Sequence, residues 1–304
     1  MSEAPDFQAL FDRCSNWGRW GADDERGTLN LITPELRVRA ASLVRDGVSV
    51  SCAQPINTVG DSDNTSPAVH TMVRAGDVAD GDAVRFTSDY LAVAPHGVAH
   101  SHLDALCHFF WRGQTYNGRP VADVTSLGAR ANAITIGQDG IVSRGVLLDI
   151  PRVLGVEWLE PEHAIRVSEL ESAETACGVR VESGDILLVR TGRHVRKRAL
   201  GTWDTRAALA GLHHEVAPWL KERGVALLGC DGVSDVRAHP FSVTSHPMHI
   251  LTLVALGMQL LDNQNLDDVA VACAERNRWQ FLLVIAPLKL QGGTASMVNP
   301  IAIF

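Results

Sequence analysis

Four short apolar runs limit the folds that this chain can adopt. They span residues 145–151, 185–192, 225–229 and 279–285. Uninterrupted apolar character over so few residues is typical of strands that are covered on both faces of a sheet. Segments with helical spacing lie between the runs, at residues 168–178, 213–223, 250–261 and 266–275. This alternation predicts an α/β fold, with α+β as the alternative.

The domain organisation follows from length and from the first residues. A chain of 304 residues with 46% hydrophobic content has ample material for a core. We expect an N-terminal arm at residues 1–32 and one domain at residues 33–304. Because Trp17 and Trp20 give the arm more apolar surface than a free terminus should expose, we expect it to cover a second copy in a homodimer or higher homo-oligomer. The alternative is an arm that folds back on its own domain.

Charge and cysteine content exclude several classes of partner. A net charge of -8 offers no electrostatic footprint for nucleic acid. The six cysteines are scattered without a C-x-x-C pair, and the first residues lack the pattern of a signal peptide, so we expect reduced thiols and a cytoplasmic location. No apolar run approaches about 18 residues, so no membrane span is expected.

Residues 96–108 hold four of the twelve histidines and therefore need a chemical explanation. Residues 84–93 predict a strand that runs into this cluster, where even-numbered side chains would share one face. A helical turn over residues 103–111 would return the last histidine to the same place. Imidazole and carboxylate together suit zinc, manganese or iron, and the carboxylate can bridge two ions. The cluster comprises His96, His100, His102, Asp104 and His108. The structural alternative is a set of capping and core histidines.

The cluster resembles the signature of the cyclase family of metal-dependent hydrolases, which is close to H-x-G-T-H-x-D-x-P-x-H. This family includes bacterial kynurenine formamidase, isatin hydrolase and a trans-dienelactone hydrolase. His102, Asp104 and His108 match the second histidine, the aspartate and the final histidine of the signature. Residues 17–30 and 292–302 are similar to the opening and closing segments of the longer members. The resemblance implies a swivelling β/β/α-type domain with a mixed sheet flanked by helices.

The first histidine of the signature is replaced by Val98 in this chain. Either His96 or His100 must then supply the missing ligand, and the regular spacing of an extended strand favours His100. The resemblance also implies distal ligands, which map to His249 and Asp262. Together these residues would hold one or two ions of a divalent transition metal, zinc or manganese.

Further residues are candidates for substrate contacts. Trp111, Tyr116 and Asn117 match the loop that follows the signature and could line a pocket, although turn formation would also explain them. Asp231 follows the apolar run at residues 225–229, where α/β sheets often contact ligands, and it could equally be a structural turn residue.

The sequence contains no serine-hydrolase elbow, P-loop or dinucleotide-binding glycine motif. A metal site would activate water for attack on a carbonyl, and His108 would accept the water proton and pass it to the leaving group. The predicted function is therefore hydrolysis of an amide, formamide, lactone or cyclic amide bond of a small molecule. The alternatives are a metal-dependent cyclase or isomerase that acts through an enolate, and a non-catalytic metal-stabilised binding protein.

Overall fold

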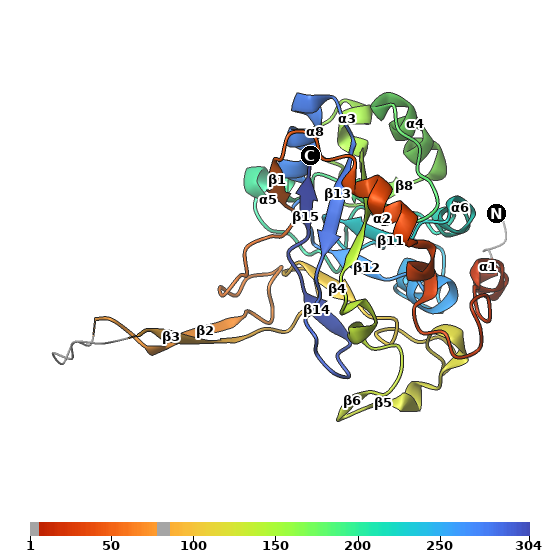
Figure 1. Cartoon of the computed structure of the whole chain (residues 1–304), viewed down its shortest axis with the longest axis horizontal. Helices are drawn as coiled ribbons and strands as arrows, with labels where there is room; N and C mark the ends of the chain where they lie inside the picture. The colour runs from red at the N-terminus through yellow and green to blue at the C-terminus, as the bar shows by residue number, and fades with distance from the viewer. Residues whose placement is uncertain (1–5, 78–85) are drawn as a thin grey trace.

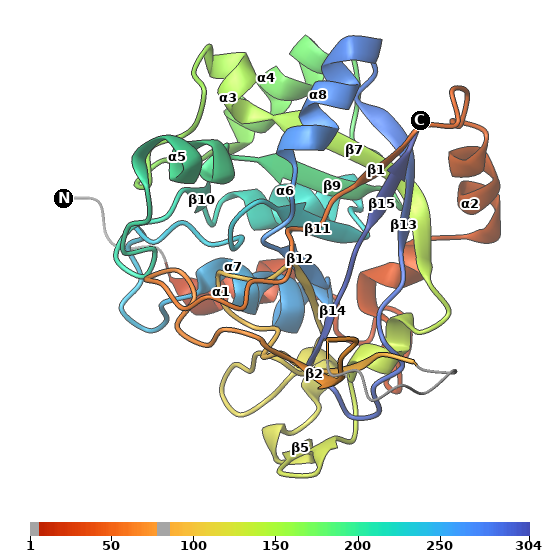
Figure 2. The same cartoon turned by 90° about the vertical axis from the view of Figure 1, so that its left-hand side faces the viewer.

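The computed structural model describes residues 6–77 and 86–304. The chain forms an α/β fold in which a large curled sheet is flanked by helices, as predicted (Figures 1 and 2). None of the described helices is long and apolar enough to cross a lipid bilayer.

In the described part of the chain, the main sheet has nine strands and mixed direction. The four central neighbours β7, β9, β11 and β12 run parallel, and the strands on either side of them pair antiparallel. All four apolar runs of the sequence contribute a strand. In spatial order the strands are β1 (Ser49–Ser51), β15 (Ile301–Ile303), β13 (Gln280–Ile285), β7 (Ile141–Asp149), β9 (Ile186–Arg190), β11 (Leu227–Cys230), β12 (Leu260–Asp262), β4 (His102–Asp104) and β14 (Ala295–Met297).

Both faces of this sheet are covered. Alternate residues of β9 enter two separate cores, with Leu187 and Val189 in one and Ile186 and Leu188 in the other. The helices that supply the two layers are α1 (Phe7–Cys14), α2 (Pro34–Ala41), α3 (Ile150–Leu154), α4 (Val167–Cys177), α5 (Arg193–Leu200), α6 (Val216–Arg223), α7 (Pro247–His249) and α8 (Asp267–Arg276). Short elements complete the fold: η1 (Gly27–Leu31), η2 (Tyr116–Gly118), η3 (Val121–Asp123), η4 (Ile134–Gly137), β5 (Val124–Thr125), β6 (Gly128–Ala129), β8 (Ala164–Ile165) and β10 (Gly211–Leu212).

The segment after α7 differs from the helix expected at residues 250–261. It is a π-helical turn, η5 (Ile250–Leu256), which ends at Gly257 with φ of 68°. Residues Leu260–Asp262 then form β12 instead of the end of a helix. Every residue of η5 is buried, so the apolar run that predicted a helix reflects full burial of the segment.

Residues 6–30 fold back on their own domain. Trp17 donates its indole N–H to the Val254 carbonyl at 2.7 Å, and the Asn16 amide donates to the Ala255 carbonyl at 2.9 Å. Gly27 lies so close to η5 that a Cβ atom on it would be 1.9 Å from the Gly257 oxygen. These contacts support the second of the two arrangements considered for the arm.

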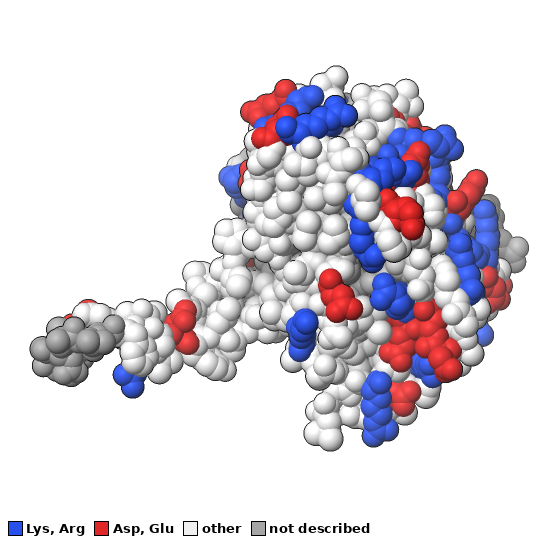
Figure 3. Space-filling model, viewed as in Figure 1, with Lys and Arg blue, Asp and Glu red and all other residues white. Residues whose placement is uncertain are grey.

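A hairpin of β2 (Val69–Arg74) and β3 (Ser88–Ala92) projects from the body of the molecule (Figure 1). Of the strand expected at residues 84–93, the structure contains Ser88–Ala92, and residues 84 and 85 lie outside the described residues. Its expected continuation into the histidine cluster is wrong, because residues 97–100 form bends. On the face drawn in Figure 3, the hairpin carries few charged side chains, while acidic and basic groups are intermixed over the body.

Candidate metal centre

Two neighbouring strands place three of the candidate side chains on one face of the sheet. His102 and Asp104 are two residues apart on β4, so they point the same way. Asp262 on β12 is the direct cross-strand neighbour of His102 and therefore shares that face. His102 Nε2 lies 3.4 Å from Asp104 Oδ1. His102 Nδ1 is 2.8 Å from the His100 carbonyl, and donation to that oxygen leaves Nε2 as the free ligand atom.

A fourth side chain, His249, reaches this face from α7. Its Nε2 atom lies 3.6 Å from Asp104 Oδ2 and 3.4 Å from Asp262 Oδ2. Its Nδ1 atom is hydrogen-bonded to Asp235, whose carboxylate also accepts the Met248 amide at 2.6 Å. Asp235 thus fixes the orientation of the ring, as carboxylates behind metal-binding histidines do. Sequence reasoning missed Asp235, for which the only signal was its place in the loop after β11.

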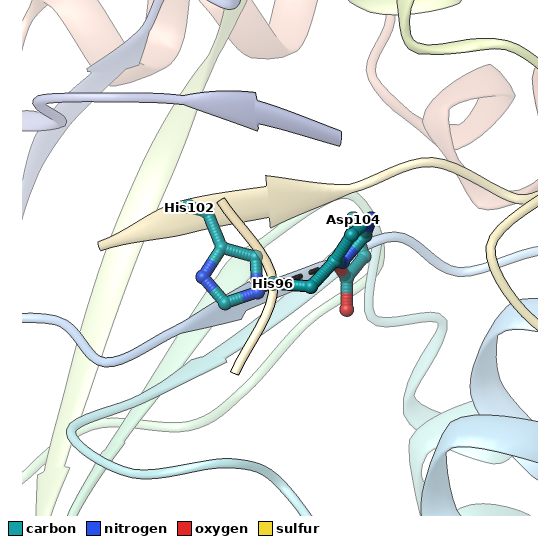
Figure 4. Close-up of side chains that lie close together, drawn as sticks. All are labelled: His96, His102 and Asp104. Atoms are coloured by element: carbon teal, nitrogen blue, oxygen red, sulfur yellow. Dashed lines mark ion pairs between the residues drawn. The ribbon is translucent and has the colours of Figure 1, made fainter. Parts of the chain in front are cut away.

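His96 completes the group, from a loop instead of a strand. The chain bends at Gly97, with φ of 114°, a conformation that favours glycine. This bend returns the His96 ring to β4, where Nδ1 lies 3.0 Å from Asp104 Oδ1 (Figure 4). His96 Nε2 is 3.0 Å from the Thr294 hydroxyl.

His100, the favoured candidate from strand spacing, lies elsewhere. An extended backbone from residue 96 to residue 104 would favour His100, but only residues 102–104 of this range form a strand. The His100 side chain is buried and lines a separate small pocket next to His96. The geometry therefore groups His96 with His102 and Asp104, and leaves His100 out.

His108 lies beside these residues without joining either group. The helix expected over residues 103–111 is absent: the His108 amide donates to the Ala105 carbonyl in a turn. The His108 ring stacks on His96, with 3.6 Å between ring centroids, and its centroid is 6.4 Å from that of His249. Burial lowers the pKa of His108 to about 3, although the nearby Asp104 raises it, so the ring is neutral near pH 7. A neutral imidazole is what a general base requires.

Within residues 6–77 and 86–304, two sets of ligand atoms are close enough to hold a cation, and Asp104 belongs to both. One set is His96, His102 and Asp104, and the other is Asp104, His249 and Asp262. Asp104 is fully buried, and ring nitrogens of His96, His102 and His249 lie 3.0–3.6 Å from its oxygens, yet among the described residues none of these contacts has hydrogen-bond geometry. Buried carboxylates are normally satisfied, so this geometry fits a bound metal ion.

The electrostatics of the site also favour a cation. Burial would raise the pKa of Asp104, but the rings of His102, His249 and His96 lower it well below its usual range. Burial would lower the pKa of His249, but Asp235, Asp104 and Asp262 raise it well above its usual range. Carboxylates that stabilise the positive charge of a buried imidazolium this strongly would stabilise a divalent cation for the same reason.

The expected substrate-binding residues divide into two groups. Trp111 lines a cavity of about 720 Å³ beside His108 and His246. Tyr116 and Asn117 hold the N-terminal segment instead, because the Tyr116 hydroxyl donates to Asp24 at 3.0 Å and the Asn117 amide group donates to three carbonyls of residues 21–24. Asp231 accepts backbone amides at the start of α5, so its contacts support the structural interpretation.

Fold and site together define an α/β protein with a buried histidine–aspartate centre. The sequence profile of the family described as "Putative cyclase" matches residues 50–235, and the chain belongs to this family, as predicted. A solved structure described as a novel cyclase is 31% identical, with a TM-score of 0.87, and the alignment covers 96% of this chain and 100% of that one. A search of curated proteins gave no match.

More distant solved structures share the fold. Isatin hydrolase A from Labrenzia aggregata, bound to benzyl benzoate, is 18% identical over 86% of this chain and 94% of its own, with a TM-score of 0.59. A potential metal-dependent hydrolase with cyclase activity is 16% identical over 84% of this chain and 98% of its own, with a TM-score of 0.51.

Proposed function

We propose that this protein is a metal-dependent hydrolase that opens an amide, formamide, lactone or cyclic amide bond of a small molecule. The observation that carries the proposal is Asp104, whose fully buried carboxylate belongs to both sets of ligand atoms and, among the described residues, faces histidine nitrogens without a contact of hydrogen-bond geometry. His96, His102, Asp104, His249 and Asp262 would hold one or two ions of zinc or manganese. The family membership and the hydrolases that share the fold support this assignment.

The side chains around the site suit hydrolysis. A bound divalent metal would lower the pKa of a water molecule toward about 7 and polarise a carbonyl. His108 is neutral and lies in van der Waals contact with His96, so it can accept a proton at the site and return it to a leaving nitrogen or oxygen. Asp235 keeps His249 in one orientation.

The cavity beside His108 is the proposed place for the body of the substrate. Its lining includes Phe109, Phe110 and Trp111, which offer apolar surface, together with residues 242–246. We propose a small organic molecule as substrate, with neither nucleic acid nor membrane as partner. A cytoplasmic location and a homo-oligomeric state belong to the same proposal.

Metal analysis tests the proposal directly. We expect the purified protein to contain zinc or manganese, and Asp104→Ala to lose both the metal and hydrolysis of an amide and lactone panel. Asp139→Ala, which alters an exposed carboxylate, is the matched control and should keep both. Stoichiometric metal in Asp104→Ala would contradict the assignment of Asp104.

Two further measurements separate hydrolysis from the alternatives. Hydrolysis in 18O-labelled water places the label in the product, whereas an enolate-based isomerisation does not. Metal without turnover on the whole panel would indicate a binding protein.

A further inference from the structure

A second, smaller pocket adjoins the candidate metal centre on the other side of His96. Its volume is about 160 Å³, and its lining includes residues 62–66, residues 96–100, Arg206 and Arg237. His96 lines this pocket and stacks on His108, which lines the large apolar cavity. The two cavities therefore meet at a pair of histidines next to Asp104.

His100 gives this small pocket the character of a binding site. The side chain is 2% exposed and has the Ser66 backbone as a polar neighbour, but among the described residues neither ring nitrogen makes a hydrogen bond of normal geometry. The Thr205 hydroxyl in the lining likewise has no hydrogen-bond partner in the described part of the chain. Because buried polar groups are almost always satisfied, these donors indicate that a polar ligand belongs in the pocket.

Arg237 determines the charge of that ligand. Its half-buried guanidinium donates to the Thr205 carbonyl at 3.3 Å and to His246 Nε2 at 2.8 Å, and no carboxylate among the described residues pairs with it. The acidic group of the lining, Asp63, is already engaged by Arg193 at 3.4 Å and Lys197 at 3.1 Å. The pocket therefore has an excess of positive charge.

Arg237 also connects the two cavities, because its partner His246 lines the large one. A molecule that occupied both cavities would span the stacked histidines and bring a central bond next to Asp104. Asp63 Oδ1, which has no hydrogen-bond partner within the described residues, disfavours a doubly charged phosphate in the small pocket, whereas a guanidinium binds a planar carboxylate well.

We propose that the substrate carries a carboxylate, which Arg237 and His100 bind in the small pocket while an apolar part fills the large cavity. This inference rests on the proposed hydrolase function for its biological meaning, but the carboxylate site itself can be tested by binding alone.

Calorimetric titration with benzoate, and with benzamide as its uncharged counterpart, tests the site in the protein as purified. We expect benzoate to bind more tightly than benzamide. Arg237→Gln should weaken benzoate binding about 10-fold or more, the scale of a lost charge-assisted hydrogen bond, and change benzamide binding little. Arg237→Lys should retain part of the affinity. Arg130→Gln, an exposed arginine outside the lining, is the matched control.

Three results would overturn the inference. They are equal binding of benzoate and benzamide, unchanged benzoate affinity in Arg237→Gln, and no saturable benzoate binding at about 10 mM. Unchanged affinity in His100→Ala would remove His100 from the site. Metal content measured in the same samples separates these failures from failure of the hydrolase proposal, which depends on the metal and not on benzoate.

Discussion

His96 and His100 are four positions apart, and the structure gives them different surroundings. His96 Nδ1 lies 3.0 Å from Asp104, whereas His100 lines the neighbouring pocket. We therefore expect His96→Ala to lower metal affinity by more than the 10- to 100-fold that is typical for loss of a group behind a ligand, roughly. His100→Ala should keep its metal. Competition with a chromophoric chelator measures the metal affinity of both variants. A greater loss of affinity in His100→Ala than in His96→Ala would show that the loop adopts another conformation when metal binds.

His108 offers a second test at the scale of a residue. We expect His108→Ala to keep its metal but to turn over about 100-fold more slowly, because a general base is lost while the ligand atoms remain. Turnover number and metal content should be measured on one preparation. Loss of the metal in this variant would make His108 a ligand.

The rule that alternate residues of an extended strand share one face predicted part of the site correctly and was wrong for His100. His102 and Asp104 share a face because β4 is extended there, and Asp262 joins them through the strand register. The same rule pointed to His100, because the sequence does not reveal that the chain bends at Gly97 with φ of 114°. Asp235 could not be found, since its role depends on contact with a helix that starts twelve residues later.

The contact between η1 and η5 is a test at the scale of elements. Gly27 has φ of 54°, and a Cβ atom on it would lie 1.9 Å from the Gly257 oxygen, which is backbone and cannot rotate away. We expect Gly27→Ala to lower the free energy of unfolding by about 2–4 kcal/mol, through strain and overpacking.

Gly18→Ala is the matched control, because Gly18 has φ of 75° but open space around its Cβ position. Gly18→Ala should lower the free energy of unfolding by only about 1–2 kcal/mol, because only the left-handed backbone conformation opposes the substitution. Urea unfolding measures the free energy of unfolding of both variants. An equal decrease in the two would mean that the N-terminal segment is not held against η5.

The elements that were predictable are the buried ones. Continuous apolar runs correctly gave β7, β9, β11 and β13, because a strand covered on both faces needs apolar side chains at every position. The strand β4 has only three residues and two of them carry the site, so composition does not mark it. The apolar run that becomes η5 and β12 could not be divided correctly, because full burial removes the periodicity that distinguishes a helix from a strand.

Stability of the whole molecule should depend on pH through two half-buried histidines, His194 and His214. Burial lowers the pKa of His194 to about 3 and that of His214 to about 4. In the unfolded chain both would bind a proton near about pH 6.5, while the folded protein stays neutral at these positions. The free energy of unfolding should therefore fall as the pH decreases from about 6.5 to about 4.

Urea midpoints at about pH 7 and about pH 5 check this dependence. A variant with both His194→Gln and His214→Gln should lose less stability on acidification than the wild type. An equal loss would assign the effect to other groups.

The exposed apolar surface of the projecting hairpin predicts that the protein forms a dimer. Five apolar side chains of β2 and β3 are about half exposed or more: Val69, Met72, Val73, Tyr90 and Leu91. Exposed apolar surface of this extent is typical of an interface. We therefore expect light scattering to give about twice the chain mass of 32.8 kDa at micromolar concentration.

Val73→Glu combined with Tyr90→Glu should shift this assembly to monomers. Leu127→Glu, at a side chain that is 96% exposed on another loop, is the matched control and should have no effect. A monomeric wild type would refute the prediction.

The position of Asp104 in both sets of ligand atoms links the two sets thermodynamically. If each set binds an ion, the free energies of the two binding events cannot be independent, because one carboxylate contributes to both. The coupling is reciprocal, so whatever the first ion does to the affinity for the second, the second does equally to the first. A metal titration of this protein should therefore depart from the curve of two independent sites. The sign of the departure would show whether the first ion strengthens or weakens binding of the second through Asp104.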